Sequence, residues 1–335
     1  VDSLTYENQQ TYQITTPRAT YLYHTQGAGL ASLIDLDTQD WISFRDIPGS
    51  QTAGEYRGIP NLVFNDGDAA NSFFHPGFTN GTSQLISAGP LKVTVRSQAG
   101  PPENFWDVLW EFYPEYARLT VLEAGTADSE PYWFLYEGTI GGGMDAGDVV
   151  VRSDGVQTSA FDYGAVWETT LVPPSWVYFR DTAAARALFF SDDQGDTSPE
   201  SYRPMGQSPG STPEMTVFGF GRVLDTSPNS LVGRLSGAGR SFTLGFVEDH
   251  TVAVASIEGA VDLLTVIVGE PTLLAPVITS TPVTAATVGQ AYSYDVDASG
   301  YPAPTYSLTV QPAGMAINTL TGMISWLPTV VGDYD

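Results

Sequence analysis

The amino-acid sequence predicts an all-β protein in which a large, multi-stranded antiparallel β-sandwich precedes a small one. Helical periodicity is almost missing, and the best helical candidate is the short segment Thr182–Ala187. Apolar residues instead alternate with polar ones or form short solid blocks, as the strands of a sandwich require. Glycine, proline, aspartate or asparagine bounds most blocks, and the chain holds 34 glycines and 23 prolines. Both patterns favour many short strands joined by turns.

Strands are expected along the whole of residues 1–268, which we assign to the large domain. In chain order they are Ala19–His24, Leu30–Ile34, Trp41–Phe44, Leu91–Ser97, Val108–Tyr113, Arg118–Leu122, Tyr132–Gly138, Val149–Ser153, Trp176–Arg180, Arg186–Ser191, Met215–Arg222, Ser241–Glu248 and Ala260–Val268. The number of expected strands is larger than a small Ig sandwich contains. A propeller is disfavoured, because the sequence shows no repeat with a period of about 40–50 residues. A large two-sheet sandwich, of the kind seen in mutarotase-like folds and polysaccharide-lyase domains, fits better.

The last part of the chain carries its most specific motifs. They are Pro276–Ser280, Gly289–Tyr294, Pro304–Leu308, Pro312–Met315 and Thr321–Thr329. Two alternating runs, Ala291–Val296 and Thr305–Val310, lie between glycine and proline turns. The segment resembles the bacterial Ig-like repeat, which implies a small Ig-like sandwich at 276–335. A short, stiff linker at 269–275 would join it to the large domain.

The same resemblance carries expectations about location and neighbours. Such repeats are stalks and spacers, so we expect an extracellular or cell-surface protein of a bacterium. A complete repeat would continue past Gly332-Asp333-Tyr334 into one more strand. Either the polypeptide continues into further Ig-like repeats, or a neighbouring subunit supplies the strand by self-assembly, because an unpaired sheet edge is a template for another chain.

The charge of the chain limits its partners. Asp and Glu number 38 against 13 Lys and Arg, a formal net charge of −25. Phosphate binding needs clustered cations, so nucleic acid and anionic lipid are both disfavoured. The sequence contains no run of about 18 apolar residues, so it predicts no membrane-spanning helix. The absence of cysteine fits a large secreted bacterial domain, whose core is stable without disulfides.

Five polar residues in one stretch are candidates for chemistry on an acidic sugar. Glu55, Tyr56, Arg57 and Asn61 lie in the segment GEYRGIPN, and His75 follows. In a polysaccharide lyase, Arg57 would neutralise a uronate carboxylate while Tyr56 or His75 moves the proton. With Glu55 and Asn61 on sugar hydroxyls, the same groups would serve binding without catalysis. A structured loop in which Glu55 and Arg57 satisfy each other explains the pattern equally well.

A second candidate is the aromatic run Tyr132–Gly138. Alternation places Trp133 and Glu137 on one face of this strand and Tyr136 on the other. Glu137 is a further catalytic candidate, and Trp133 and Tyr136 are candidates for substrate binding, because rings stack on sugars and carboxylates accept their hydroxyls. Core packing, with Glu137 paired to an arginine, explains the same residues.

Two acidic loops are candidates for calcium, although no cofactor is required. Asp66 and Asp68 lie in the first, and Asp192, Asp193 and Asp196 in the second. Carboxylates at alternate loop positions deliver the oxygens that Ca²⁺ prefers. Neither loop has the EF-hand spacing, and solvated loops of an acidic protein would show the same residues.

Several blocks of the large domain resemble a group of secreted bacterial β-proteins associated with polysaccharide processing. They are Gly27–Asp35, Gly54–Val63, Phe74–Phe78, Tyr132–Gly142, Trp176–Asp181 and Met215–Arg222. This resemblance implies the same sandwich architecture. It carries no catalytic residue across.

Three functions stay open from the sequence. The first is an enzyme acting on a polysaccharide, either a lyase or a glycoside hydrolase, and the second is a glycan-binding protein without catalysis. The third is a structural surface protein, a stalk, sheath or filament subunit that assembles through its sandwich domains. If Arg57, His75 and Glu137 share one cleft, an enzyme or binder is favoured. If they pair off separately, the structural function is favoured.

Overall fold

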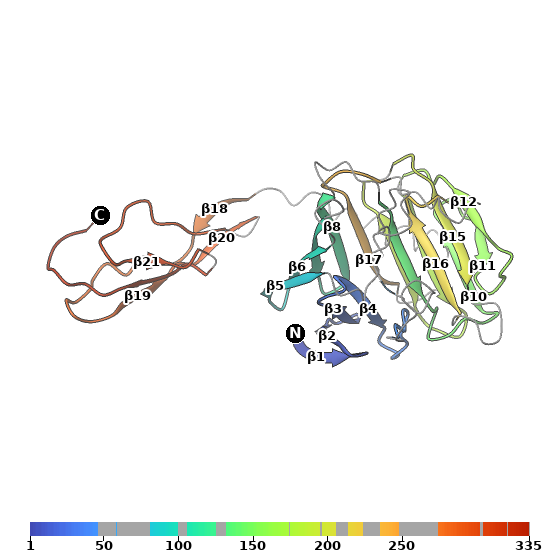
Figure 1. Ribbon diagram of the computed structural model, residues 1–335, viewed down its shortest axis with the longest axis horizontal. Helices are drawn as coiled ribbons and strands as arrows, with labels where there is room; N and C mark the ends of the chain where they lie inside the picture. The colour runs from blue at the N-terminus through green and yellow to red at the C-terminus, as the bar shows by residue number, and fades with distance from the viewer. Residues whose placement is uncertain are drawn as a thin grey trace. The chain divides into compact units, whose positions relative to one another are not determined.

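The structure is a computed structural model that describes most of the chain. The described residues are 1–45, 58, 81–99, 106–124, 132–173, 175–194, 196–205, 214–223, 235–247, 274–301, 304–319 and 321–334. The chain divides into two compact units, Val1–Leu263 and Leu264–Asp335. Figure 1 shows the strands of both units and labels most of them. The predicted linker at 269–275 stays a prediction, because its first five residues lie outside the described ranges.

The described residues form strands, turns and bridges but no helix, so the predicted all-β class is confirmed. The helical candidate Thr182–Ala187 was wrong: its residues make the turn of a β-hairpin. Asp181 holds this turn, since its carboxylate accepts a hydrogen bond from Ala183 N at 2.7 Å. Within the described ranges, no helix has the length and apolar character needed to cross a membrane.

A nine-stranded antiparallel sheet forms one layer of the large unit. Its strands, in spatial order, are β11 (Gln157–Ser159), β10 (Asp148–Arg152), β13 (Ser175–Asp181), β14 (Ala187–Asp192), β17 (Ser241–Val247), β8 (Tyr116–Ala124), β7 (Trp106–Phe112), β6 (Val93–Ala99) and β5 (Thr82–Ala88). Most of these were predicted to within about two residues at each end, because alternation of buried residues marks a strand clearly. The predicted strand Ala260–Val268 lies outside the described residues.

Two four-stranded sheets form the other layer. The N-terminal sheet has the order β1 (Asp2–Tyr6), β2 (Gln9–Thr15), β3 (Thr20–His24) and β4 (Gly29–Ile34). The second, which we call the β9 sheet, has the order β12 (Trp167–Thr169), β15 (Glu200–Met205), β16 (Met215–Phe220) and β9 (Phe134–Gly138).

Aromatic side chains join the two layers into one core. On the N-terminal sheet, Tyr21 packs on Phe112 of the nine-stranded sheet with ring centroids 5.0 Å apart. On the β9 sheet, Phe134 stacks on Phe242 at 4.5 Å. Burying such rings supplies much of the stability of a sandwich, because each removes a large apolar area from water. The predicted large sandwich is therefore confirmed.

The predicted strand Trp41–Phe44 is not a strand in the structure. The carboxylate of Asp40 accepts hydrogen bonds from Leu33 N at 3.2 Å and Ile42 N at 3.0 Å, and the chain turns there. Trp41 is nevertheless fully buried. Its apolar character therefore indicated burial rather than an extended backbone.

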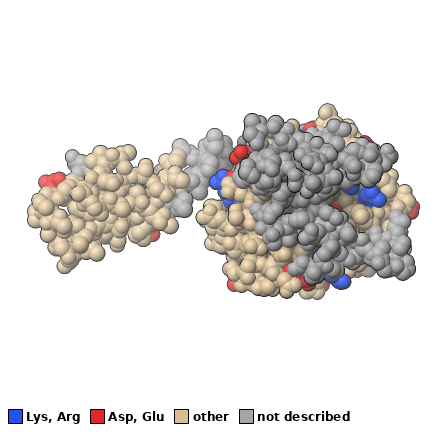
Figure 2. Space-filling model, viewed as in Figure 1, with Lys and Arg blue, Asp and Glu red and all other residues tan. Residues whose placement is uncertain are grey.

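The C-terminal unit has two small sheets of its own. They consist of β18 (Leu274–Ile278) with β20 (Ala298–Tyr301), and of β19 (Tyr292–Asp295), β22 (Met323–Trp326) and β21 (Ala316–Ile317) in the order β19-β22-β21. The predicted strand Thr305–Val310 is irregular. This unit contains no lysine or arginine, and its atoms in Figure 2 are accordingly red or tan without blue.

Candidate functional site

The β9 sheet has two faces of different character. Alternation turns Phe134, Tyr136 and Phe218 toward the nine-stranded sheet, where they belong to the main core. We call the opposite face the outer face. It carries alternate residues of three strands: Leu135 and Glu137 of β9 with Trp133 just before it, Met215, Val217 and Gly219 of β16, and Ser201, Arg203 and Met205 of β15. The outer face thus combines apolar residues with an acid and an arginine.

The apolar part of the outer face is a small buried cluster. Trp133, Leu135, Met215 and Val217 are each at most 3% exposed, and Met205 packs against them. Trp133 is covered rather than open, and its indole Nε1 has no hydrogen-bond partner. The predicted alternation of this strand is therefore right, but Trp133 does not present a free ring on which a sugar would stack.

Tyr136 is a correction to the predicted site. Its side chain is fully buried, and its hydroxyl donates a hydrogen bond to the carbonyl oxygen of Trp41 at 2.5 Å. Its ring packs on Phe179 at 4.9 Å and on Phe190 at 5.0 Å. We therefore reassign Tyr136 from substrate binding to the core between the two layers.

The polar part of the outer face is organised around Gly219. In the register of the β9 sheet, Gly219 lies between Ser201 on β15 and Leu135 on β9. A Cβ atom on Gly219 would lie 2.9 Å from Cβ and 3.0 Å from Cδ of Arg222. The missing side chain therefore makes the space in which the stem of Arg222 crosses the sheet.

The chain reaches this arrangement through a turn at the end of β16. Gly221 has a φ of 66°, a left-handed conformation that glycine adopts without strain. A Cβ atom there would lie close to the side chain of Leu235. The turn lets Arg222 fold back over Gly219.

Arg222 is a buried cation with few partners. Arg222 is only 5% exposed, and its Nη1 donates one long hydrogen bond of 3.4 Å to Oγ of Ser201. Burial lowers the pKa of Arg222 to about 10; the carboxylate of Glu137 opposes this shift and Arg203 adds to it. Among the described residues, Arg222 forms no ion pair. A guanidinium has five N–H donors, so most of its capacity has no protein partner within the described ranges.

Glu137 connects this face with the first predicted cluster. Gly58 N donates to the carbonyl oxygen of Glu137 at 2.9 Å, and Glu137 N donates to that of Gly58 at 3.1 Å. Gly58 belongs to the segment GEYRGIPN, so one residue of that segment pairs directly with the second predicted cluster. The other members of the first cluster, Glu55, Tyr56, Arg57, Asn61 and His75, lie outside the described residues.

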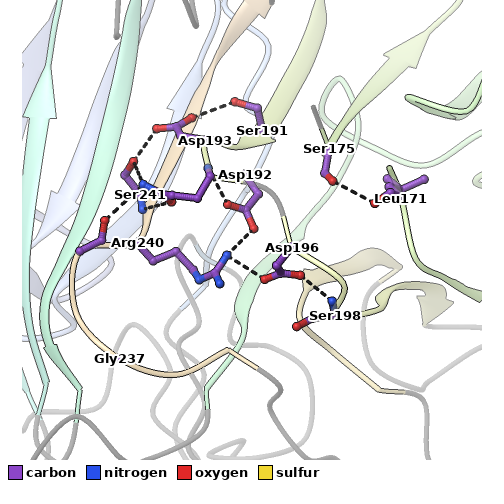
Figure 3. A network of polar contacts seen from close by, with 12 residues as sticks. Leu171, Ser175, Ser191, Asp192, Asp193, Asp196, Ser198, Gly237, Arg240 and Ser241 are labelled. Atoms are coloured by element: carbon purple, nitrogen blue, oxygen red, sulfur yellow. Dashed lines mark hydrogen bonds and ion pairs between the residues drawn. The ribbon is translucent and has the colours of Figure 1, made fainter. Parts of the chain in front are cut away.

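The second predicted calcium loop is part of a polar network (Figure 3). Arg240 Nη1 lies 2.9 Å from a carboxylate oxygen of Asp192 and 2.8 Å from one of Asp196. Asp193 accepts a hydrogen bond from Oγ of Ser241 at 2.7 Å and lies 3.1 Å from Nε of Arg118. Asp66 and Asp68, of the first loop, lie outside the described residues.

This network supplies its own counter-charges. Two guanidinium groups face its three carboxylates, and the acids and arginines are all at most 18% exposed at their side chains. Calcium at Asp192, Asp193 and Asp196 therefore gains no support, because each of these carboxylates already lies beside an arginine. The network joins the ends of β14, β17 and β8, which is a structural role.

Beside the network lies a buried carboxyl group that pairs with none of the described arginines. Glu200, at the start of β15, is 3% exposed and accepts a hydrogen bond from Leu171 N at 2.8 Å. Burial raises the pKa of Glu200 to about 8, and Asp196 and Asp192 add to the rise while the Leu171 hydrogen bond opposes it. Glu200 is thus protonated over much of the neutral range.

Comparisons with known proteins identify the C-terminal unit. Residues 275–335 match the family model described as "Putative Ig domain". The predicted Ig-like repeat is therefore confirmed for this part of the chain. No curated protein matches the chain.

Three solved structures resemble the large unit. HI1317 is 12% identical, with 73% of this chain and 95% of that chain covered and a TM-score of 0.49. A "putative aldose 1-epimerase" of Escherichia coli K12 is 9% identical, with coverages of 71% and 99% and a TM-score of 0.45. A galactose mutarotase-like protein of Lactobacillus casei is 11% identical, with coverages of 71% and 100% and a TM-score of 0.46. Similarity at this level assigns no function to the chain.

Arg222 is the residue that the sequence analysis missed. It closes the block Met215–Arg222, which was predicted as a strand and noted for its resemblance to a group of secreted proteins, but not as a site. The available signal was the spacing Gly219-Phe220-Gly221-Arg222, in which one glycine turns the chain and the other makes space. Without the sheet register, nothing in the sequence showed that the arginine folds back.

Proposed function

We propose that the large unit binds an acidic polysaccharide at the outer face of the β9 sheet, with Arg222 holding a uronate carboxylate. The observation that carries the proposal is the buried guanidinium of Arg222, whose described contacts amount to one hydrogen bond of 3.4 Å. The Ig-like C-terminal unit supports a secreted or surface location for such a protein.

Most N–H donors of Arg222 have no acceptor among the described residues. Keeping a cation away from water is costly unless it is paired and hydrogen-bonded. A carboxylate offers two parallel hydrogen bonds to a guanidinium, a geometry that a lysine does not reproduce. A sugar acid at Arg222 would therefore recover the interaction that the described protein groups do not supply.

Neighbouring groups suit the rest of a sugar. The hydroxyl of Ser201 already contacts Arg222, and Glu137 lies on the same face. Hydroxyl and carboxylate side chains are the groups with which carbohydrate sites bind sugar hydroxyls. These residues would orient the ring whose carboxylate Arg222 holds.

The net charge of −25 opposes this ligand at long range. At physiological ionic strength, exposed charges more than about 8–10 Å apart are largely screened, whereas a buried contact is screened much less. Affinity for a uronate polymer should therefore rise as salt is added from very low ionic strength. A steady fall with salt would instead indicate binding through exposed cations.

Affinity electrophoresis of the full chain against a panel of polysaccharides tests the proposal. Polygalacturonate and alginate should retard the protein, whereas neutral dextran should not. Arg222→Met should weaken binding by at least about tenfold, because a hydrogen bond to a charged group contributes about 1.5–3 kcal/mol. Arg180→Met, which removes a guanidinium from the other layer, is the matched control and should bind normally. Equal retardation of both variants would refute the assignment to Arg222.

A narrower function, β-elimination, is favoured by the bridge between Gly58 and Glu137. We propose that one of Tyr56 and His75 removes the proton at C5 of the uronate as the C4–O bond breaks. The electrons of the C–H bond form the C4=C5 double bond, and the other residue gives its proton to the leaving oxygen. Ultraviolet absorbance of the unsaturated product is the measurement. His75→Ala should abolish turnover and change the free energy of unfolding by less than about 1 kcal/mol. Binding without any product from the whole panel would reject catalysis and leave the binding function.

A further inference from the structure

A second group of acids lies at the edge of the nine-stranded sheet, away from the β9 sheet's outer face. Asp148 begins β10 and Asp181 ends β13, and the antiparallel register pairs these two residues directly. Asp145 lies in the loop that precedes β10. One ligand oxygen from each of the three carboxylates lies within 4.8 Å of the other two.

Asp148 is the member that requires an explanation. Asp148 is fully buried, with 0% of its surface exposed. Its Oδ2 accepts a hydrogen bond from Asp145 N at 2.8 Å, but its Oδ1 has no hydrogen-bond partner. A buried carboxylate oxygen without a partner is costly, so such an atom indicates a missing ligand.

The other two carboxylates are held in place by the backbone. Asp145 Oδ1 accepts from Gly147 N at 2.5 Å, and Asp181 Oδ1 accepts from Ala183 N at 2.7 Å. These local hydrogen bonds restrain both carboxylates, each of which has one oxygen within 4.8 Å of Asp148's. The second oxygen of each remains available for another ligand.

Two glycines leave space around the carboxylates. A Cβ atom on Gly141, whose φ is 57°, would lie 2.7 Å from Oδ2 of Asp181. A Cβ atom on Gly147 would lie 3.0 Å from Oδ1 of Asp145 and 3.3 Å from Oδ1 of Asp181. The loop backbone therefore approaches the acids more closely than a loop with side chains at these positions would.

The described residues supply no positive charge to this group. Within the described ranges, no lysine or arginine forms an ion pair with Asp145, Asp148 or Asp181. Three acids this close repel one another unless a cation lies between them.

We propose that Asp145, Asp148 and Asp181 bind a Ca²⁺ ion. Oxygen ligands around Ca²⁺ lie at about 2.3–2.6 Å from the ion, so two of them can be up to about 5 Å apart. The spacing of 4.8 Å or less fits this range. Mg²⁺ binds at about 2.1 Å and retains its water strongly, so three carboxylates on a loop and two strand ends suit it less well. The ion would fasten the loop before β10 to the end of β13.

Calorimetric titration of the chelator-treated full chain with CaCl₂ tests the site. We expect one Ca²⁺ per chain and a rise of the melting temperature when Ca²⁺ is present. Asp148→Asn should lower the affinity by at least about tenfold, since even groups outside the ligand shell contribute about 10–100-fold. In the same variant, Ca²⁺ should no longer raise the melting temperature.

Asp196→Asn is the matched control, because it removes an acid from the network that already has its arginines. It should bind Ca²⁺ as tightly as the unchanged protein. Loss of binding in Asp196→Asn but not in Asp148→Asn would overturn the assignment. The absence of any Ca²⁺ binding by the folded protein, or equally tight binding of Mg²⁺, would overturn it as well. If Asp148→Asn does not fold, Asp145→Asn, at the exposed member of the group, gives the same test.

Discussion

The two ends of the β13–β14 hairpin carry acidic groups of opposite kinds. At one end, Asp192 lies in a network in which Arg240 and Arg118 face the carboxylates. At the other end, Asp181 lies beside Asp148, and none of the described arginines or lysines pairs with either. The same residue type therefore has a structural role where the fold brings a counter-charge to it. Where the fold brings none, we infer a ligand.

Arg222 resembles the acids at Asp148 and Asp181 in having no described ion-pair partner, but it carries the opposite charge. It is a buried cation on the outer face of the β9 sheet, and its described contacts leave most of its N–H groups without a partner. Both sites follow from one argument, because a buried charge is costly until something neutralises it. The predictions below test that argument at the paired and the unpaired sites.

The largest effect is expected from breaking the paired site. Arg240→Met should lower the free energy of unfolding by about 3–5 kcal/mol, because it leaves the buried carboxylate of Asp192 and the partly buried one of Asp196 without their cation. Urea unfolding followed by tryptophan fluorescence measures this change. A loss below about 1 kcal/mol would show that the network is no stronger than a surface ion pair.

A smaller effect, dependent on pH, is expected at Glu200. Burial raises the pKa of its carboxyl group from the ordinary value of 4.5 to about 8 in the folded protein. An acid whose pKa is higher in the folded protein than in the unfolded one contributes stability that is fully present below its unfolded pKa of about 4.5. This stability is lost as the pH rises from about 4.5 through about 8. Glu200→Gln lacks the titration and keeps an oxygen for Leu171 N.

The variant should therefore gain stability relative to the unchanged protein as the pH rises through this window. The difference should reach a few kcal/mol, since one unit of pKa difference corresponds to about 1.4 kcal/mol. Melting temperatures of both proteins between pH 4 and pH 9 measure it. Parallel curves would show that the pKa of Glu200 is the same in the folded and the unfolded protein, so that burial does not raise it.

The smallest effect on stability is expected at Arg222. Arg222→Met removes a buried charge that has no described ion-pair partner, so the free energy of unfolding should stay the same or rise by up to about 2 kcal/mol. The contrast with Arg240→Met sharpens the comparison, because the substitution is identical and only the pairing differs. If both variants lose several kcal/mol, Arg222 is a structural residue like Arg240.

The sequence predicted the architecture better than the sites. Alternation along Tyr132–Gly138 correctly placed Glu137 on the face opposite Tyr136. The acids of the second loop were also recognised, but not their partner Arg240, which lies 48 residues after Asp192 in the sequence. Such pairings depend on how strands align across a sheet, and strand order is not written in local periodicity.

The same limit explains the two sites that sequence analysis missed. Asp148 and Asp181 come together only because β10 pairs with β13 in one register. Arg222 reaches the outer face only because Gly221 turns the chain and Gly219 leaves space on β16. Glycine spacing and paired acids were visible in the sequence, but their meaning required the sheet.

The central claim is that the outer face of the β9 sheet binds a sugar carboxylate through Arg222. Calorimetric titration of a galacturonate oligomer into the full chain and into Arg222→Met tests it most directly, with melting temperatures recorded for both. The account predicts that the variant binds at least about tenfold more weakly while melting at the same or a higher temperature. Unchanged affinity in a folded Arg222→Met protein would contradict it.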